Sequence, residues 1–149
     1  MLETLRSRSI EEGDVEQVLA IQAACPEIAQ WTRWDYDRVA RGEMAGWVAE
    51  EQESVVGFIV ARKIAKEIEI LNFAVAPEMR ARGIGAMLLQ ESLAWAKTFE
   101  ATHAILEVRA SNTAALRFYE RHNFQVVGRR SRYYISPPED ALLLTAKIE

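Results

Sequence analysis

The sequence predicts a mixed α/β fold, of the α+β kind, around a central sheet of about seven strands. Two observations lead to this prediction. β-rich runs alternate along the chain with runs whose apolar residues recur at helical spacing, so strands and helices share one fold. Two of the β-rich runs, 46–51 and 55–64, flank a short polar stretch, which is typical of an antiparallel hairpin. The length of 149 residues suits a single domain over 1–149.

The N-terminal third is expected to contain a strand and two helices. The stretch 4–10 predicts the strand, and Asp14 is expected to cap a helix that ends before Pro26. A second short helix should stop at Gly42. Trp31 and Trp34 lie three residues apart, the spacing of one helical face, so core packing is favoured and lining of a substrate pocket is the alternative.

The middle of the chain predicts a strand, a loop and a long helix. In the stretch 66–76, glutamates alternate with isoleucines before the run becomes apolar, which indicates a strand that enters from solvent and becomes buried on both faces. Pro77 should end this strand. Beyond the loop, apolar residues at helical spacing, including Leu88 and Leu89, predict an amphipathic helix.

The C-terminal third predicts a buried strand at 103–110, a helix capped by Ser111 or Asn112, and two final strands at 124–135 and 140–148. Glu107 is the unusual residue here, because it is a carboxylate inside an otherwise apolar strand. Burying such a group without a partner is costly. An ion pair with Arg109 or another arginine would be the ordinary structural explanation, and a catalytic carboxylate is the functional one.

The overall composition excludes several function classes. The formal net charge is −4, the opposite of the balance typical of nucleic-acid-binding surfaces, so we expect no nucleic-acid partner. No apolar run approaches the roughly 20 residues that span a bilayer, and no signal-like segment begins the chain, so no membrane and a cytoplasmic location are expected. One cysteine allows no internal disulfide, and with two histidines it makes no metal site. Cys25 is expected to be a small packing residue.

A loop with two arginines and two glycines joins the apolar strand to the long helix, in the stretch 80–86. A helix N-terminus has backbone amides without partners and carries about half a positive charge. Glycine lets an anion approach this backbone, and arginine adds forked donors that match phosphate oxygens. Strand, charge and helix together therefore favour a diphosphate site over a tight turn with solvated arginines.

The pattern R-x-x-G-x-G at 80–85, together with "LEVRASNTAALRFYERHNFQVVGRRSRYY" and "EDALLLTAKI", resembles the GNAT N-acetyltransferase superfamily over nearly the whole chain. The resemblance is closest to its bacterial ribosomal-protein-alanine N-acetyltransferase (RimI) type. It implies a GNAT-type, mostly antiparallel sheet with helices on both faces, and acetyl-CoA as co-substrate. The stretch 25–39 departs from the RimI pattern, which leaves the ribosomal substrate open.

The resemblance also assigns the cofactor residues. The acetyl and pantetheine part would lie along a strand that splays from its neighbour, the diphosphate would lie on the loop, and one side chain would contact the pantetheine. These positions correspond to Phe73, Ala74 and Val75, to Arg80, Ala81, Arg82, Gly83, Ile84, Gly85 and Ala86, and to Asn112. A helix cap is an equally good interpretation of Asn112.

The resemblance makes Glu107 the general base and Tyr119 the acid beside the sulfur, where Tyr119 would act first as a hydrogen-bond donor; a core tyrosine is the alternative. A protein N-terminus has a pKa near 8, so roughly a tenth of it is neutral at pH 7, against about 4 in 10,000 for a lysine near 10.4. One carboxylate therefore suits an α-amine better than a lysine.

The predicted activity is acetyl transfer to the N-terminal α-amine of a protein, with a ribosomal N-terminal alanine as one candidate acceptor. Tyr134 and Trp34 are the expected acceptor-binding residues. A small-molecule amine or a lysine as acceptor, and an acyl-CoA-binding module without turnover, are the alternatives. The protein is expected to be a monomer or a weak dimer.

Overall fold

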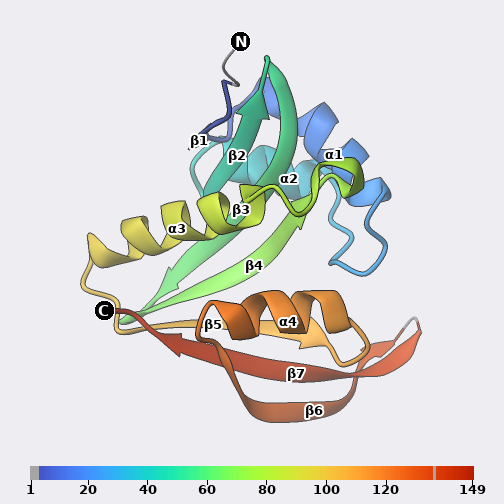
Figure 1. Cartoon of the computed structure of the whole chain (residues 1–149), viewed down its shortest axis with the longest axis vertical. Coiled ribbons are helices and arrows are strands. Elements are labelled where there is room, and N and C mark those ends of the chain that lie inside the picture. The colour runs from blue at the N-terminus through green and yellow to red at the C-terminus, as the bar shows by residue number, and fades with distance from the viewer. Residues whose placement is uncertain (1–3, 136) are drawn as a thin grey trace. The chain divides into compact units, whose positions relative to one another are not determined.

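The computed structural model describes residues 4–135 and 137–149. Figure 1 shows the elements, which follow one another as β1 (Arg6–Ser9), the 3-10 helix η1 (Glu12–Asp14), α1 (Val15–Ala23), α2 (Arg33–Ala40), β2 (Ala45–Glu51), β3 (Ser54–Ile64), β4 (Glu67–Val75), η2 (Pro77–Met79), α3 (Ile84–Lys97), β5 (His103–Arg109), α4 (Thr113–Arg121), β6 (Gln125–Ile135) and β7 (Pro138–Lys147). The strands hydrogen-bond in the order β1-β2-β3-β4-β5-β7-β6. The predicted mixed fold with a seven-stranded, mostly antiparallel sheet is confirmed.

The chain forms two compact units. The first unit comprises Met1–Arg62 and Ile70–Trp95, and the second comprises Lys63–Glu69 and Ala96–Glu149. Each unit has its own strands and at least one helix.

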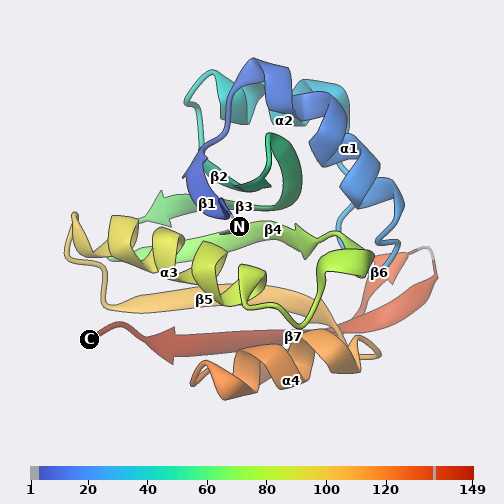
Figure 2. The same cartoon turned by 45° about the horizontal axis from the view of Figure 1, so that its top comes forward.

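In the first unit, helices lie on both faces of the sheet, as Figure 2 shows for α1, α2 and α3. Two consecutive residues of β2 show that its side chains point alternately to the two faces. A side chain at Gly46 would meet Val39 of α2, whereas the ring of Trp47 packs against Trp95 of α3 at 5.7 Å between centroids. Successive residues of a strand point to opposite faces, so α2 and α3 cover opposite sides of β2.

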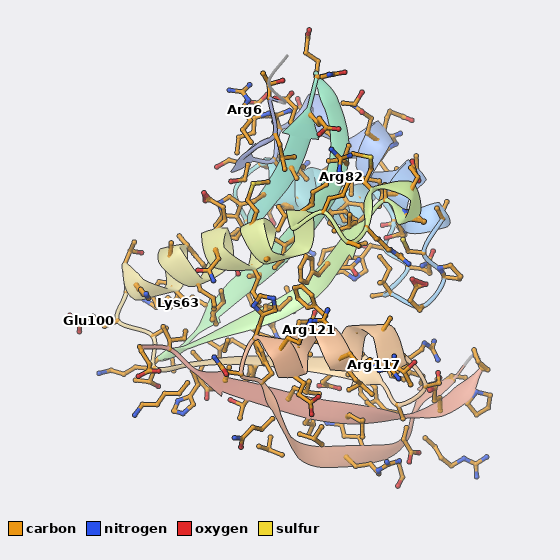
Figure 3. All side chains as sticks on the ribbon, viewed as in Figure 1. Arg6, Lys63, Arg82, Glu100, Arg117 and Arg121 are labelled. Atoms are coloured by element: carbon orange, nitrogen blue, oxygen red, sulfur yellow. The ribbon has the colours of Figure 1, made fainter. Side chains whose placement is uncertain are left out.

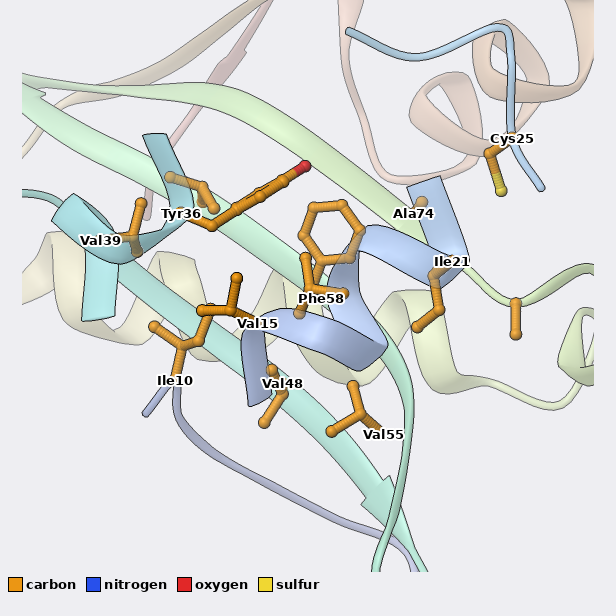
Figure 4. Packing of buried hydrophobic residues seen from close by; sticks show 13 residues of the cluster. Ile10, Val15, Ile21, Cys25, Tyr36, Val39, Val48, Val55, Phe58 and Ala74 are labelled. Atoms are coloured by element: carbon orange, nitrogen blue, oxygen red, sulfur yellow. The ribbon is translucent and has the colours of Figure 1, made fainter. Parts of the chain in front are cut away.

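The core of the first unit lies between the sheet and helices α1 and α2 (Figure 4). Tyr36 of α2 and Phe58 of β3 are its largest fully buried rings, and they meet edge to face at 5.6 Å between centroids. Cys25 belongs to this cluster as a buried free thiol, which confirms its predicted packing role. The edge-to-face contact of Tyr36 with Phe58 is of a kind that adds about 0.5–1.5 kcal/mol to the stabilisation from burial.

The β2–β3 hairpin confirms the predicted antiparallel pair. Glu51 pairs with Ser54, and the two connecting residues, Gln52 and Glu53, have φ of 50° and 67°. Two central residues with positive φ are characteristic of a type I′ turn, whose twist matches that of the flanking strands.

Three local predictions for the first unit are wrong. The Asp14 carboxylate makes no cap hydrogen bond to α1; it binds the Glu11 amide and the Arg8 guanidinium. Trp34 is 63% exposed and lies under the Arg41 guanidinium, while Trp31 precedes α2 and packs on Tyr36, so the two tryptophans do not share a buried helical face. The end of β4 was predicted to be buried on both faces. Its residues instead alternate between buried and half-buried along the whole strand, so only one face is fully covered.

The second unit contains β5, which pairs in parallel with the start of β4 and antiparallel with β7. β6 pairs antiparallel with β7 and is the last strand in the order. The helix α4 begins after Asn112, whose Oδ1 accepts from the Ala115 amide at 3.2 Å. The predicted cap at Asn112 is confirmed, and Ser111 is not the cap.

Within the described part of the chain, no helix is long and apolar enough to cross a membrane. Across residues 4–135 and 137–149, no group of three or more histidine, cysteine, aspartate or glutamate side chains is arranged to hold a metal ion.

Candidate functional site

The loop before α3 presents a run of unsatisfied backbone amides. Gly83 has a φ of +83°, a left-handed conformation that glycine adopts without strain. The first intrahelical bond of α3 runs from the Met87 amide to the Gly83 carbonyl at 3.1 Å. Among the described residues, the backbone amides of Ile84, Gly85 and Ala86 find no backbone acceptor. These donors and the positive end of the helix dipole form a place for an anion.

Two arginines flank this loop, and both hold carboxylates of the first unit. Arg80 Nη2 lies 3.2 Å from Glu27 Oε1, and Arg82 Nη2 lies 2.9 Å from Glu51 Oε2. Both guanidinium groups are nearly half exposed, and Figure 3 labels Arg82 on its loop. The exposed Arg80–Glu27 pair contributes about 0–1 kcal/mol, so an incoming phosphate can compete for Arg80 at little cost. Glu51 is more buried and accepts from both terminal nitrogens of Arg82, so that arginine is held more firmly.

The end of β4 is tied to the same loop. The Val75 carbonyl accepts from Arg80 Nε at 3.3 Å, and Cys25 Sγ lies 3.8 Å from the same oxygen. Ala74 is buried, and its carbonyl faces Gly57 of β3, where an added Cβ would lie 3.1 Å from the oxygen. A larger residue at position 57 would therefore push against the strand that the sequence predicts to hold the acetyl and pantetheine part.

A buried polar network, which no local sequence pattern predicts, links this strand to helices α1 and α2. The Tyr36 hydroxyl donates to Gln22 Oε1 and lies 2.9 Å from Asn72 Nδ2, which donates to it. The Gln22 side chain also binds the backbone of Trp31: Oε1 accepts from the Trp31 N–H at 2.9 Å, and Nε2 donates to the Trp31 carbonyl at 2.8 Å. Asn72 Nδ2 binds the Ala29 carbonyl at 3.0 Å. The network thus fixes the segment between α1 and α2 against β4.

Glu107 is the most unusual carboxylate of the second unit. Its Oε2 atom is buried and has no hydrogen-bond partner among the described residues. Its Oε1 atom lies 3.7 Å from Arg130 Nη2, which is beyond hydrogen-bond distance. The ordinary structural alternative, an ion pair with another arginine, is thus present but loose. A buried acceptor without a donor is rare in native proteins and indicates a functional role.

Arg109, the first alternative partner of Glu107, contacts other groups. Its Nη1 lies 3.3 Å from Glu139 Oε1, and its guanidinium stacks over the Tyr134 ring at 4.2 Å from the centroid. Tyr134 is half-buried, and burial followed by the negative charge of Glu107 raises the pKa of its phenol.

Tyr119 lies on α4, on the buried face of the helix. It is 7% exposed, and its ring packs edge to face with Phe124 at 5.2 Å between centroids. Burial raises the pKa of the phenol well above its usual range, so Tyr119 stays protonated at neutral pH. This suits a hydrogen-bond donor better than a group that gives up its proton readily.

The structure distributes the predicted residues over both units. Phe73–Val75, the loop Arg80–Ala86 and Trp34 belong to the first unit, and Glu107, Asn112, Tyr119 and Tyr134 belong to the second. Sequence reasoning missed the partners of the loop arginines, and it allowed for an arginine beside Glu107 without identifying Arg130. No local signal reveals them, because each pairs residues that are distant in the chain.

Known proteins resemble this chain in sequence and in structure. A protein-family model described as the acetyltransferase (GNAT) family matches residues 14–124, a range that includes the loop, Glu107 and Tyr119. An N-alpha-acetyltransferase of Sulfurisphaera tokodaii is 31% identical over 157 residues, covering 96% of this chain and 93% of that protein. A ribosomal protein bS18-alanine N-acetyltransferase of Salmonella typhimurium is 33% identical over 98 residues, covering 64% of this chain and 66% of that protein. The crystal structure of Ard1 from Thermoplasma volcanium has a TM-score of 0.89 at 28% identity, covering 97% of this chain and 98% of that one.

Proposed function

The chain belongs to the GNAT acetyltransferase family, and on this premise we propose that it transfers the acetyl group of acetyl-CoA to the N-terminal α-amine of a protein. The observation that carries the proposal is the buried Oε2 of Glu107, which has no partner among the described residues, on β5, the strand whose Arg109 stacks over the half-buried Tyr134 ring.

The loop before α3 fits the diphosphate of acetyl-CoA. Backbone amides at the start of α3 have no backbone acceptor among the described residues, and the two arginines hold carboxylates that a phosphate can replace. Gly83, in its left-handed conformation, keeps Cβ atoms away from this surface. When bound, acetyl-CoA supplies an activated thioester carbonyl to the reaction. We assign the end of β4, Phe73–Val75, to its acetyl and pantetheine part.

Glu107 serves as the general base. Its Oε1, held among the described residues only by the loose contact with Arg130, accepts a proton from the acceptor amine, directly or through a water, while the amine attacks the thioester carbonyl. An α-amine with a pKa near 8 needs little help, because roughly a tenth of it is already neutral at pH 7. A single loosely paired carboxylate is therefore sufficient for an N-terminal acceptor.

Tyr119 serves the leaving thiolate. Its pKa is raised by burial, so its hydroxyl remains a donor throughout the neutral range. A donor aimed at a developing negative charge stabilises the transition state more than the ground state. We assign Asn112 a second role besides its cap, as a contact of the pantetheine, and we assign Tyr134 and Trp34 to acceptor binding.

Relatives support a protein N-terminus as acceptor over a small amine. The names of the Sulfurisphaera and Salmonella proteins describe N-alpha and ribosomal-protein-alanine acetylation. A ribosomal N-terminal alanine is the finer candidate for this chain.

The test measures thiol release from acetyl-CoA with three kinds of acceptor. The first is short peptides with a free N-terminus and no lysine, the second is matching peptides with a blocked N-terminus and one lysine, and the third is small primary amines. Faster release with the free-N-terminus peptides is expected. Release with small amines or lysines alone would overturn the choice of acceptor, and no release with any amine would support a binding module without turnover.

A further inference from the structure

The arginines of β6 differ in how their charges are balanced. Arg129 forms an ion pair with Asp140, whereas Arg130 has only the distant Glu107 carboxylate at 3.7 Å. The side chain of Arg132 forms no ion pair with any described residue, but its charge acts on the Asp140 carboxylate, which also accepts from the Arg132 amide at 2.8 Å. All three side chains are exposed. Arg129 and Arg132 therefore share one carboxylate, and in the described part of the chain Arg130 has only the loose contact with the carboxylate assigned as base.

Binding of a protonated acceptor amine changes this balance. The amine is a hydrogen-bond donor that can bind Oε1 of Glu107, and so it competes successfully with a guanidinium that makes no hydrogen bond there. Once the amine has taken the carboxylate, Arg130 has lost its nearest counter-charge. Arg130 then presents a positive charge without a carboxylate partner, and Arg132, two residues further along β6, shares Asp140 with Arg129.

Arg130 stays close to the site after it is released. Its guanidinium lies over the ring of Tyr133 at 5.3 Å from the centroid, and Tyr133 is about half exposed. A cation above an aromatic face at this distance is attracted by the ring. The displaced charge therefore remains on β6 beside Tyr133.

From this geometry we propose, on the basis of the proposed function, that the enzyme selects acceptors whose residues directly after the N-terminal one carry carboxylates. An aspartate or glutamate there supplies the counter-charge that Glu107 gives up, and an arginine there is repelled by Arg130 and Arg132. The protein as a whole has a net charge of −4, so the selectivity comes from these two side chains and not from the general field.

The experiment compares kcat/KM for three peptides that begin with alanine and differ only at their second and third residues, which are Asp-Glu, Ala-Ala or Arg-Arg. We expect kcat/KM to fall in the order acidic, neutral, basic, with about three- to tenfold between the extremes, since exposed charge pairs are individually weak. Added salt should narrow the difference because exposed charges are screened.

The preference is the ratio of kcat/KM for the acidic peptide to kcat/KM for the basic peptide. The variant Arg132→Gln should halve the logarithm of this ratio, and R130Q/R132Q should bring the ratio to about one. Turnover of the neutral peptide shows whether each variant is active. The matched control is Arg121→Gln, an exposed arginine of α4 without an ion pair among the described residues (Figure 3). It should leave the preference unchanged.

The outcomes separate this inference from the proposed function. If none of the three peptides is acetylated, the proposed function fails. If the neutral peptide is acetylated but the acidic one is no better than the basic one, or if R130Q/R132Q keeps the preference, the inference is wrong and the proposed function stands.

Discussion

The guanidinium of Arg80 binds the carboxylate of Glu27, with 3.2 Å between Nη2 and Oε1. The same nitrogen lies 3.2 Å from Cys25 Sγ, so the loop before α3 is fastened to the segment that follows α1. If the loop holds the diphosphate of acetyl-CoA, the ligand must compete with Glu27 for this arginine. The free protein thus occupies its phosphate donor with an internal carboxylate.

Replacing Glu27 by Gln should tighten the binding of CoA. The variant removes a negative charge beside the diphosphate, and the half-exposed pair contributes at most about 1 kcal/mol, so a two- to fivefold lower Kd in calorimetric titration is expected. Binding of pantetheine, which has no phosphate, should not change. Glu16→Gln, which removes the exposed Arg33–Glu16 pair of the same unit, is the control. Weaker CoA binding by the Glu27 variant would show that Glu27 orients Arg80 instead of competing for it.

Replacing Tyr119 by Phe should lower kcat by about tenfold or more, because the leaving thiolate loses its donor. Burial raises the pKa of Tyr119 above its usual range, so the phenol does not titrate near neutrality. The loss should therefore be the same from pH 6 to pH 9 in steady-state kinetics. A loss that disappears towards one end of this range would mean that Tyr119 changes protonation during the reaction, against its assignment as a fixed donor.

Replacing Tyr36 by Phe should reduce the free energy of unfolding by about 1–2 kcal/mol, measured by urea denaturation. The change removes the hydroxyl that joins Gln22 and Asn72, although each amide keeps a backbone partner. Tyr133→Phe, at an exposed tyrosine of β6, should change stability by less than about 0.5 kcal/mol. Equal effects of the two substitutions would show that the buried network contributes nothing to stability.

Acid should destabilise the first unit partly through Asp14. Burial alone would raise the pKa of this carboxyl, but hydrogen bonds from Arg8 and the Glu11 amide outweigh it and leave the pKa below its ordinary value. A lowered pKa in the folded state stabilises above the unfolded-state value of about 3.9, and this stabilisation is lost as the pH falls through the folded-state value. Asp14→Asn should therefore be less stable than the parent at pH 7, and the difference in urea midpoint should shrink below about pH 4. A difference that is constant from pH 7 to pH 3 would contradict this account.

Local patterns predicted the fold well because the elements have strong local signals. The hairpin turn at Gln52 and Glu53, the Asn112 cap and the helix after the glycine loop all depend on residues close in the chain. Trp34 and Asp14 were placed wrongly for the opposite reason. Spacing and residue type could not indicate that Arg41 covers an exposed Trp34, or that Arg8 takes the Asp14 carboxylate from the helix.

The candidate site was predictable in its chemistry but not in its partners. The loop amides and the isolated Glu107 carboxylate follow from sequence, since each is a local anomaly. Glu27, Glu51 and Arg130 do not, because ion pairs across strands and loops depend on the folded geometry. These partners determine how strongly ligands compete for the site, so affinity and selectivity are properties that the sequence alone does not reveal.

The most direct test of the account uses one peptide that has a free N-terminal alanine and one internal lysine, incubated with acetyl-CoA and analysed by fragment mass spectrometry. The account predicts an acetyl group on the α-amine, no modification of the lysine, and at least about tenfold slower modification by Glu107→Gln. Acetylation of the lysine instead, or equal rates for the parent and the Glu107 variant, would contradict it.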